Sequence, residues 1–217
     1  MTALPVFVIG QSPRPDIEAE LRAAAPGLQV TLRGALDGLS REEIAHLAPR
    51  SDADALFTIL PGGEKVRLSK QAVTERLAPM IPKGLALLNC TGKFTGLPKR
   101  GLLIEPSVIL NALVAAMLKE GRLGLFIPLT EQADTLQAER AEPGITAHSV
   151  TLEPGSDDAA RDEAAARMAD FRPDLVVLDC MSYTRADKAR IARRLSCPIL
   201  LGIDVAARAA AALLPTV

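Results

Sequence analysis

The chain has 217 residues, a length that suits one compact domain of ordinary size or two small lobes that share a core. Hydrophobic residues make up 48% and charged residues 24%, and 25 basic residues nearly balance 26 acidic ones, so no strong field is present to attract nucleic acid. The three cysteines include no CxxC pair, which argues against a disulfide framework and against a zinc site.

The N-terminal stretch predicts a cytoplasmic protein that does not enter a membrane. It has no basic region before its apolar run, and that run ends at Gly10 and Gln11. We therefore expect neither a signal peptide nor a membrane span. The odd number of cysteines favours a reducing compartment.

Short apolar runs alternate with longer helical patterns, which predicts strand-helix-strand units around mostly parallel sheets. In the first half, Pro15 suits the first turn of a helix, Ser40 and Glu43 form a capping box, and Ser69 caps a helix of two turns. The expected strands of this half are 5–9, 28–33, 54–60, 84–89 and 102–104, with a short return at 65–68.

The pattern restarts after an expected helix over 107–119. The stretches VFVIGQS and LALLNCTG of the first half are similar in kind to LGLFIPLT and LVVLDCMS of the second. We therefore expect an α/β fold of two similar lobes around a pseudo-two-fold cleft, with the first lobe at 1–107 completed by 204–217 and the second at 108–203. The remaining expected elements are strands at 123–127, 145–152, 174–179 and 199–203, and helices at 131–140, 157–170, 185–195 and 204–214.

Cys90 and Cys180 each follow a predicted buried strand, at the edge of the sheet where α/β proteins bind ligands. Backbone N–H groups and a helix dipole at such a position favour a thiolate. Two thiols on opposite sides of a planar carbon can invert it, because one removes the proton and the other supplies a proton to the opposite face. A single strand-end cysteine is more often inert core, so the hypothesis depends on the matched pair. Cys197 has no such match, which favours a place in the core.

Two long stretches carry a resemblance to a known superfamily. Residues 85–128, with Cys90 and the Glu105-Pro106 helix start, resemble the middle of aspartate/glutamate racemase superfamily members. Residues 174–210 are similar to their second-cysteine region. Within that superfamily, the motifs IGQSPRPDI, RGALDGLS, CTGKF and DCMSYT together are similar to the AroM protein family.

The resemblance implies a racemase or epimerase that acts at the carbon alpha to a carboxylate without pyridoxal phosphate or any other cofactor. Cys90 and Cys180 match its two catalytic thiols. Amino-acid racemases of the superfamily often carry Asp-Ser, Cys-Asn-Thr and Gly-Cys-Thr where this chain has QS, CTG and DCMS. Two alternatives therefore stay open: a single-cysteine isomerase or decarboxylase of a small dicarboxylate, and a non-catalytic protein that binds small carboxylates.

The loops around the two thiols supply candidate groups for binding a substrate carboxylate. The planar fork of Arg14 can clamp a carboxylate, and hydroxyl and N–H groups beside the thiols can stabilise the enolate-like charge. As solvated side chains or helix caps, the same residues would need no function. The candidate substrate-binding residues are Gln11, Ser12, Arg14, Thr91, Gly92, Thr130, Met181, Ser182 and Tyr183.

Several other sites are not indicated by the sequence. His46 and His148 have no cysteine or acidic neighbours at metal spacing, so we expect no metal site. The chain contains no GxGxxG, GxxxxGK or GxSxG motif, which argues against dinucleotide, nucleoside triphosphate and serine-triad chemistry. The expected partner is a small-molecule carboxylate, with no nucleic acid and no membrane, and a homodimer is left open.

Overall fold

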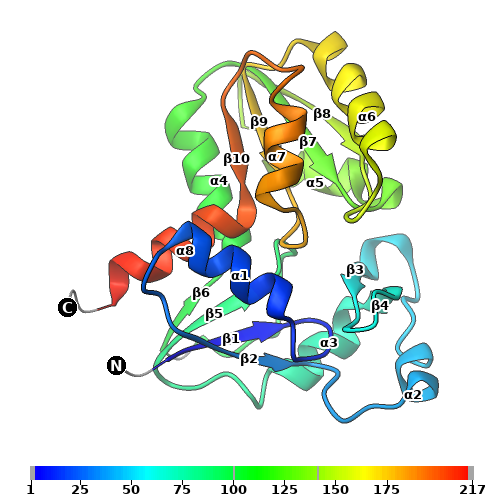
Figure 1. The fold of residues 1–217 in the computed structure, drawn as a ribbon, viewed down its shortest axis with the longest axis vertical. Helices are drawn as coiled ribbons and strands as arrows, with labels where there is room; N and C mark the ends of the chain where they lie inside the picture. The colour runs from blue at the N-terminus through cyan, green and yellow to red at the C-terminus, as the bar shows by residue number, and fades with distance from the viewer. Residues whose placement is uncertain (1–2, 100, 141, 215–217) are drawn as a thin grey trace. The chain divides into compact units, whose positions relative to one another are not determined.

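The computed structural model describes residues 3–99, 101–140 and 142–214. The chain divides into two compact units, the first formed by Met1–Ser107 with Ala206–Val217 and the second by Val108–Val205. Each unit contains a sheet of four parallel strands with helices packed on it (Figure 1). The expected fold class, α/β with mostly parallel sheets, is confirmed.

The sheet of the first unit has the strand order β2-β1-β5-β6. Its central strands are continuous apolar runs, as strands covered on both faces should be. The register places Val8 of β1 beside Asn89 of β5, so these two strands end side by side. The strands are β1 (Leu4–Val8), β2 (Val30–Gly34), β5 (Leu85–Asn89) and β6 (Leu102–Ile104).

A separate antiparallel hairpin, β3 (Ala55–Ile59) with β4 (Lys65–Ser69), belongs to the same unit and confirms the expected return strand. Its apolar side chains share one core cluster with the face of the sheet that carries Leu88. The helices of this unit are α1 (Pro15–Ala24), α2 (Arg41–Ala45) and α3 (Lys70–Leu77), with a short 3-10 turn η1 (Asp52–Asp54).

Side-chain caps begin two of these helices where the sequence predicts them. The Glu43 N–H donates to Ser40 Oγ over 3.2 Å, and the Ser40 N–H donates to Glu43 Oε2 over 2.7 Å, which completes the capping box of α2. Ser69 Oγ accepts from the N–H of Ala72 at the start of α3. Both predicted caps are confirmed.

The sheet of the second unit has the order β10-β9-β7-β8. Helices α4 and α5 pack on one of its faces in a single apolar cluster, and α6 and α7 lie beside each other, joined by ion pairs (Figure 1). The strands are β7 (Gly121–Ile127), β8 (Ile145–Thr151), β9 (Leu175–Leu178) and β10 (Ile199–Leu201). The other elements of this unit are α4 (Pro106–Met117), η2 (Thr130–Gln132), α5 (Ala133–Arg140), α6 (Asp158–Phe171) and α7 (Arg185–Ile191), and α8 (Gly202–Leu213) continues from it into the first unit.

The two sheets have the same topology. Followed from one edge, they have the orders β2-β1-β5-β6 and β8-β7-β9-β10, so β1 matches β7 and β5 matches β9. Cys90 follows β5 and Cys180 follows β9. The two cysteines therefore occupy equivalent places, each within its own sheet.

Some predicted boundaries are wrong near the C-terminus. Helix α7 ends at Ile191 instead of residue 195, because the chain after it turns with three-residue hydrogen bonds, such as Arg194 N–H to the Ile191 carbonyl. Strand β10 ends at Leu201 instead of residue 203, because α8 begins directly at Gly202. Within the described residues, no helix is both long and apolar enough to cross a membrane.

Candidate functional site

The first thiol lies directly after the end of β5. Cys90 is 8% exposed, and its Sγ accepts a hydrogen bond from the N–H of Gly92 over 3.3 Å. A side chain at Gly92 would crowd this loop, because its Cβ would lie 3.1 Å from Leu56 Cδ2 and 3.4 Å from Cys90 Sγ. The glycine therefore lets the backbone N–H approach the sulfur closely.

The second thiol has the same local arrangement. Cys180 comes two residues after the end of β9, is 8% exposed, and accepts a hydrogen bond from the N–H of Ser182 over 3.5 Å. In both units a strand-end thiol thus accepts from the backbone N–H two residues further along the chain. A hydrogen bond donated to a sulfur atom stabilises the ionised thiolate relative to the neutral thiol.

The third cysteine lies in a different environment. Cys197 is half-buried and lies before the start of β10, whereas Cys90 and Cys180 lie after the ends of their strands. Burial raises the pKa of the Cys197 thiol, and the nearby charge of Asp174 raises it further. Cys197 therefore supplies an internal comparison for the two strand-end thiols.

The residue before each cysteine differs between the units. Asp179 is buried and accepts from Arg140 of α5 at both oxygens, over 2.8 Å and 2.9 Å, and Arg140 also donates to Asn111 of α4. Asn89 is a neutral amide, and its buried Oδ1 has no hydrogen-bond partner within the described residues. The strand end before Cys180 is therefore tied to α5 by a buried ion pair, and through Arg140 to Asn111 of α4 by a hydrogen bond.

Sequence reasoning missed Arg140. It lies 39 residues before Asp179, and no local pattern connects the two. The signal that was available is Asp179 itself, because a carboxylate at the end of a fully apolar strand needs a cation to compensate its lost hydration.

The loop after β1 begins beside Cys90, since Val8 and Asn89 are paired, and its polar side chains bind other parts of the chain. Gln11 Nε2 donates to the carbonyls of Leu36 and Leu39. Ser12 donates to Asp37 from its N–H over 2.6 Å and from its Oγ over 2.7 Å. The loops after β1 and β2 are therefore joined by side-chain hydrogen bonds.

Arg14 is neither the solvated side chain nor the open carboxylate clamp considered from the sequence. It is 3% exposed, and its guanidinium donates to both oxygens of Asp16 and to the carbonyl of Ile59. Burial would raise the pKa of Asp16, but the bonds and charge of Arg14 hold it below its ordinary value. The fork of Arg14 therefore already binds a carboxylate, that of Asp16.

Asp37 also accepts from the N–H of Gly34 over 2.8 Å. A Cβ at Gly34 would lie 2.5 Å from Asp37 Oδ1 and 2.5 Å from the carbonyl oxygen of Gly10, so only glycine fits between the two loops.

The remaining expected residues lie in the loops that follow β5, β7 and β9. Thr91 and Met181 are buried beside their cysteines. The Thr130 hydroxyl shares a hydrogen bond of 3.0 Å with that of Thr151. Tyr183 is buried and its hydroxyl donates to the carbonyl of Leu152. Burial raises the pKa of Tyr183, and the neighbouring acidic groups of Cys180, Asp187 and Asp179 raise it further. Tyr183 therefore holds its loop against the chain after β8.

Among the described residues, no three histidine, cysteine, aspartate or glutamate side chains are grouped so that they could hold a metal ion. The polar groups beside the thiols are instead hydroxyls and backbone N–H groups, which can bind an anion such as a carboxylate.

The model of the AroM protein family matches residues 4–214. The chain belongs to the AroM family. No curated protein matches its sequence significantly. The family assignment made from the four motifs is therefore confirmed.

Solved structures with the same fold include three enzymes of two kinds. A glutamate racemase from Francisella tularensis in complex with D-glutamate has a TM-score of 0.60 and 14% identity, and the match covers 97% of the AroM chain and 81% of the racemase chain. A variant of arylmalonate decarboxylase has a TM-score of 0.57 and 16% identity, covering 99% and 95%. An allantoin racemase from Klebsiella pneumoniae has a TM-score of 0.56 and 14% identity, covering 97% and 87%. At these identities the likeness shows that this AroM protein has the racemase-like fold.

Proposed function

We propose that this AroM protein is a cofactor-independent enzyme that moves a proton at the carbon alpha to the carboxylate of a small molecule. The observation that carries the proposal is the matched pair of thiols, each at the end of the equivalent strand and each accepting from the N–H two residues on. Solved structures with this fold include racemases, among them a glutamate racemase in complex with the carboxylate D-glutamate, which is consistent with such chemistry.

In the proposed reaction, Cys90 and Cys180 act on opposite faces of one substrate. The thiolate of one takes the proton from the alpha carbon, and the electron pair of the C–H bond moves toward the carboxylate to form an enediolate. The thiol of the other gives its proton to the opposite face, so the centre is inverted and the two thiols exchange protonation states. The donors beside the thiols, among them Thr91 and Ser182, stabilise the enediolate charge.

The test is turnover of a panel of small chiral carboxylates in deuterium oxide. We expect the wild type to incorporate solvent deuterium at the alpha carbon while it racemises the substrate. Cys90→Ser and Cys180→Ser should each lower the racemisation rate by about 100-fold or more, because a serine hydroxyl is a far weaker acid and base at neutral pH. Cys197→Ser is the matched control and should keep the wild-type rate. Full racemisation by either strand-end serine variant would contradict the proposal.

One observation favours a second candidate, a single-thiol isomerase or decarboxylase. The flanks of the thiols differ, with a neutral amide at Asn89 and an ion-paired carboxylate at Asp179. In that case only one serine variant loses activity, and recovered substrate contains no deuterium. Binding of a carboxylate without turnover, retained when both Cys90 and Cys180 are changed to alanine, would instead indicate a binding protein.

A further inference from the structure

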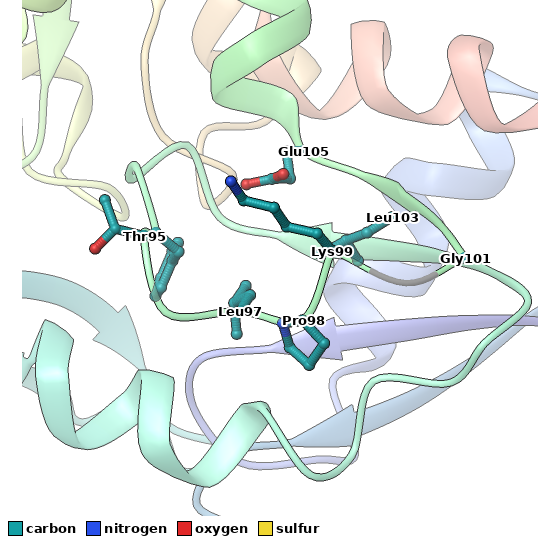
Figure 2. Close-up of a pocket in the computed structure, with 8 residues that line it drawn as sticks. Thr95, Leu97, Pro98, Lys99, Gly101, Leu103 and Glu105 are labelled. Carbon is teal, nitrogen blue, oxygen red and sulfur yellow. The ribbon is translucent and has the colours of Figure 1, made fainter.

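A cavity of about 460 Å³ lies in the first unit, along the loop that follows the Cys90 segment (Figure 2). Its volume falls within the range of small-molecule sites. Phe94, Leu97 and Leu103 supply apolar walls, Thr95 a hydroxyl, and Lys99 and Glu105 opposite charges. Cys90 is not among the residues that line the cavity.

Glu105 brings an uncompensated carboxylate to this cavity. It follows β6, whose Ile104 pairs with Leu87 of β5, so Glu105 lies beside Leu88 at the same edge of the sheet. Glu105 is half-buried and makes no hydrogen bond or ion pair within the described chain, and this partial burial raises the pKa of its carboxyl. A partly desolvated carboxylate without a partner gains most from a ligand that brings a cationic nitrogen.

Lys99 brings the opposite charge to the same cavity (Figure 2). No ion pair joins Lys99 to Glu105 among the described residues, although their charges are opposite and both side chains line the cavity. The Lys99 amino group and the Glu105 carboxylate point toward each other in Figure 2, so a ligand that carries both signs can pair with both of them.

A neighbouring cavity of about 440 Å³ provides a contrast. Its carboxylates are already satisfied, since Asp54 accepts from the N–H groups of Arg50 and Gln71, and Glu75 accepts from the Gln71 side chain. The hydrogen bonds there hold helix α3 to the preceding loop, and nothing in that cavity calls for a charged ligand.

We infer that the cavity between Lys99 and Glu105 is a binding site for a small dipolar molecule. An ammonium group of the ligand pairs with Glu105, an acidic group pairs with Lys99, and a short carbon chain contacts Phe94, Leu97 and Leu103. The site is formed by the loop between β5 and β6, by β6 and by Glu105 after it, and it uses neither strand-end thiol, so the inference is independent of the proposed function.

Isothermal titration calorimetry with 4-aminobutanoate and 6-aminohexanoate tests the inference, with butylamine and butanoate as ligands that lack one charge. We expect saturable binding of at least one dipolar probe, and affinities about tenfold or more weaker for the two singly charged ones. In Glu105→Gln the preference for the dipolar probe over butanoate should disappear. In Lys99→Met the preference over butylamine should disappear, and Glu75→Gln, in the neighbouring cavity, should bind like the wild type.

Three results would overturn the inference: no saturable binding of either dipolar probe, equal affinity in wild type and both cavity variants, or binding that blocks the alkylation of Cys90 and survives Glu105→Gln. The last result would place the probe at the thiol. Glu105→Gln is nearly isosteric, and its thermal unfolding is checked beside each titration so that loss of binding is not loss of fold. A failure here leaves the serine-variant test of the thiols unaffected, and the reverse also holds.

Discussion

Two buried charged side chains of this protein, Arg14 and Asp179, each form hydrogen bonds through more than one of their atoms. The guanidinium of Arg14 donates to Asp16 and to the Ile59 carbonyl, and both carboxylate oxygens of Asp179 accept from Arg140. Planar, two-point pairing of this kind gives a fixed geometry as well as attraction. These residues therefore position the loops and strand ends beside the thiols.

The Arg14–Asp16 pair predicts a pH-dependent stability. Because the pKa of Asp16 is lowered on folding, its contribution is present above the unfolded pKa of about 4 and is lost as the pH falls through the lowered folded value. Asp16→Asn should lower the free energy of unfolding at pH 7 by about 1 kcal/mol or less, since the carboxylate is largely exposed. Urea unfolding at pH 7 and pH 3 measures the difference, which should shrink at the lower pH.

The control for this prediction is Glu18→Gln on the same helix, whose pair with Arg22 is an exposed i,i+4 contact. Glu18→Gln should lower the free energy of unfolding at pH 7 by less than Asp16→Asn does. An Asp16→Asn difference that stays the same at both pH values would show that the ionised carboxylate is not the cause.

At the scale of elements, one buried carboxylate joins the start of α7 to helix α6, in addition to the ion pairs of Arg190. Asp187 is buried, and its carboxylate accepts from the N–H of Thr184 over 2.8 Å while its own N–H donates to Thr184 Oγ1 over 3.1 Å, which completes the capping box of α7. The same carboxylate accepts from Arg161 Nε of α6 over 2.6 Å. The start of one helix is therefore tied to the side of the other.

Asp187→Ala should lower the free energy of unfolding by about 2–3 kcal/mol, because it removes the carboxylate half of the capping box and leaves the Arg161 guanidinium without its buried partner. Chemical denaturation at pH 7 measures the change. Asp170→Ala, an exposed acidic position on α6, serves as the control and should change the stability by about 0.5 kcal/mol or less. Equal effects of the two substitutions would mean that the shared carboxylate does not connect the helices.

At the scale of the whole molecule, the same strand order occurs twice, and each copy ends its second inner strand beside a cysteine. The chain leaves the first unit through α4 and returns through α8. The two units thus repeat the same sheet topology as well as similar sequence motifs. Cys90 and Cys180 occupy equivalent positions in this repeat, and Cys197 does not.

Alkylation of the three thiols against pH, followed by peptide mass spectrometry, measures this difference. We expect Cys90 and Cys180 to reach half-maximal alkylation at a lower pH than Cys197, because a backbone N–H donated to each sulfur offsets its burial, whereas burial and then the charge of Asp174 raise the pKa of Cys197. Midpoints are compared instead of rates, since the thiols differ in exposure. In urea the three midpoints should converge, and a Cys197 midpoint at or below the other two in the folded protein would contradict the prediction.

Local patterns account for most elements. Continuous apolar runs predicted the strands, and the spacing of Ser40 and Glu43 predicted a capping box, because both features act within a few residues. The end of α7 and the length of β10 were missed, since each depends on how the chain continues after it. The hydrogen bonds of Ser12 to Asp37 were missed because the two residues lie 25 positions apart.

By itself the sequence determined the α/β fold class, the AroM family and the repeated placement of a cysteine after a buried strand, because period, motif and order are readable without coordinates. Only the tertiary structure decided which charges are compensated. It paired Arg14 with Asp16 and Arg140 with Asp179, and it left Glu105 without a partner in the described chain beside a cavity. The reason is that desolvation and ion pairing depend on distances in space, and residues far apart along the chain carry no local record of those distances.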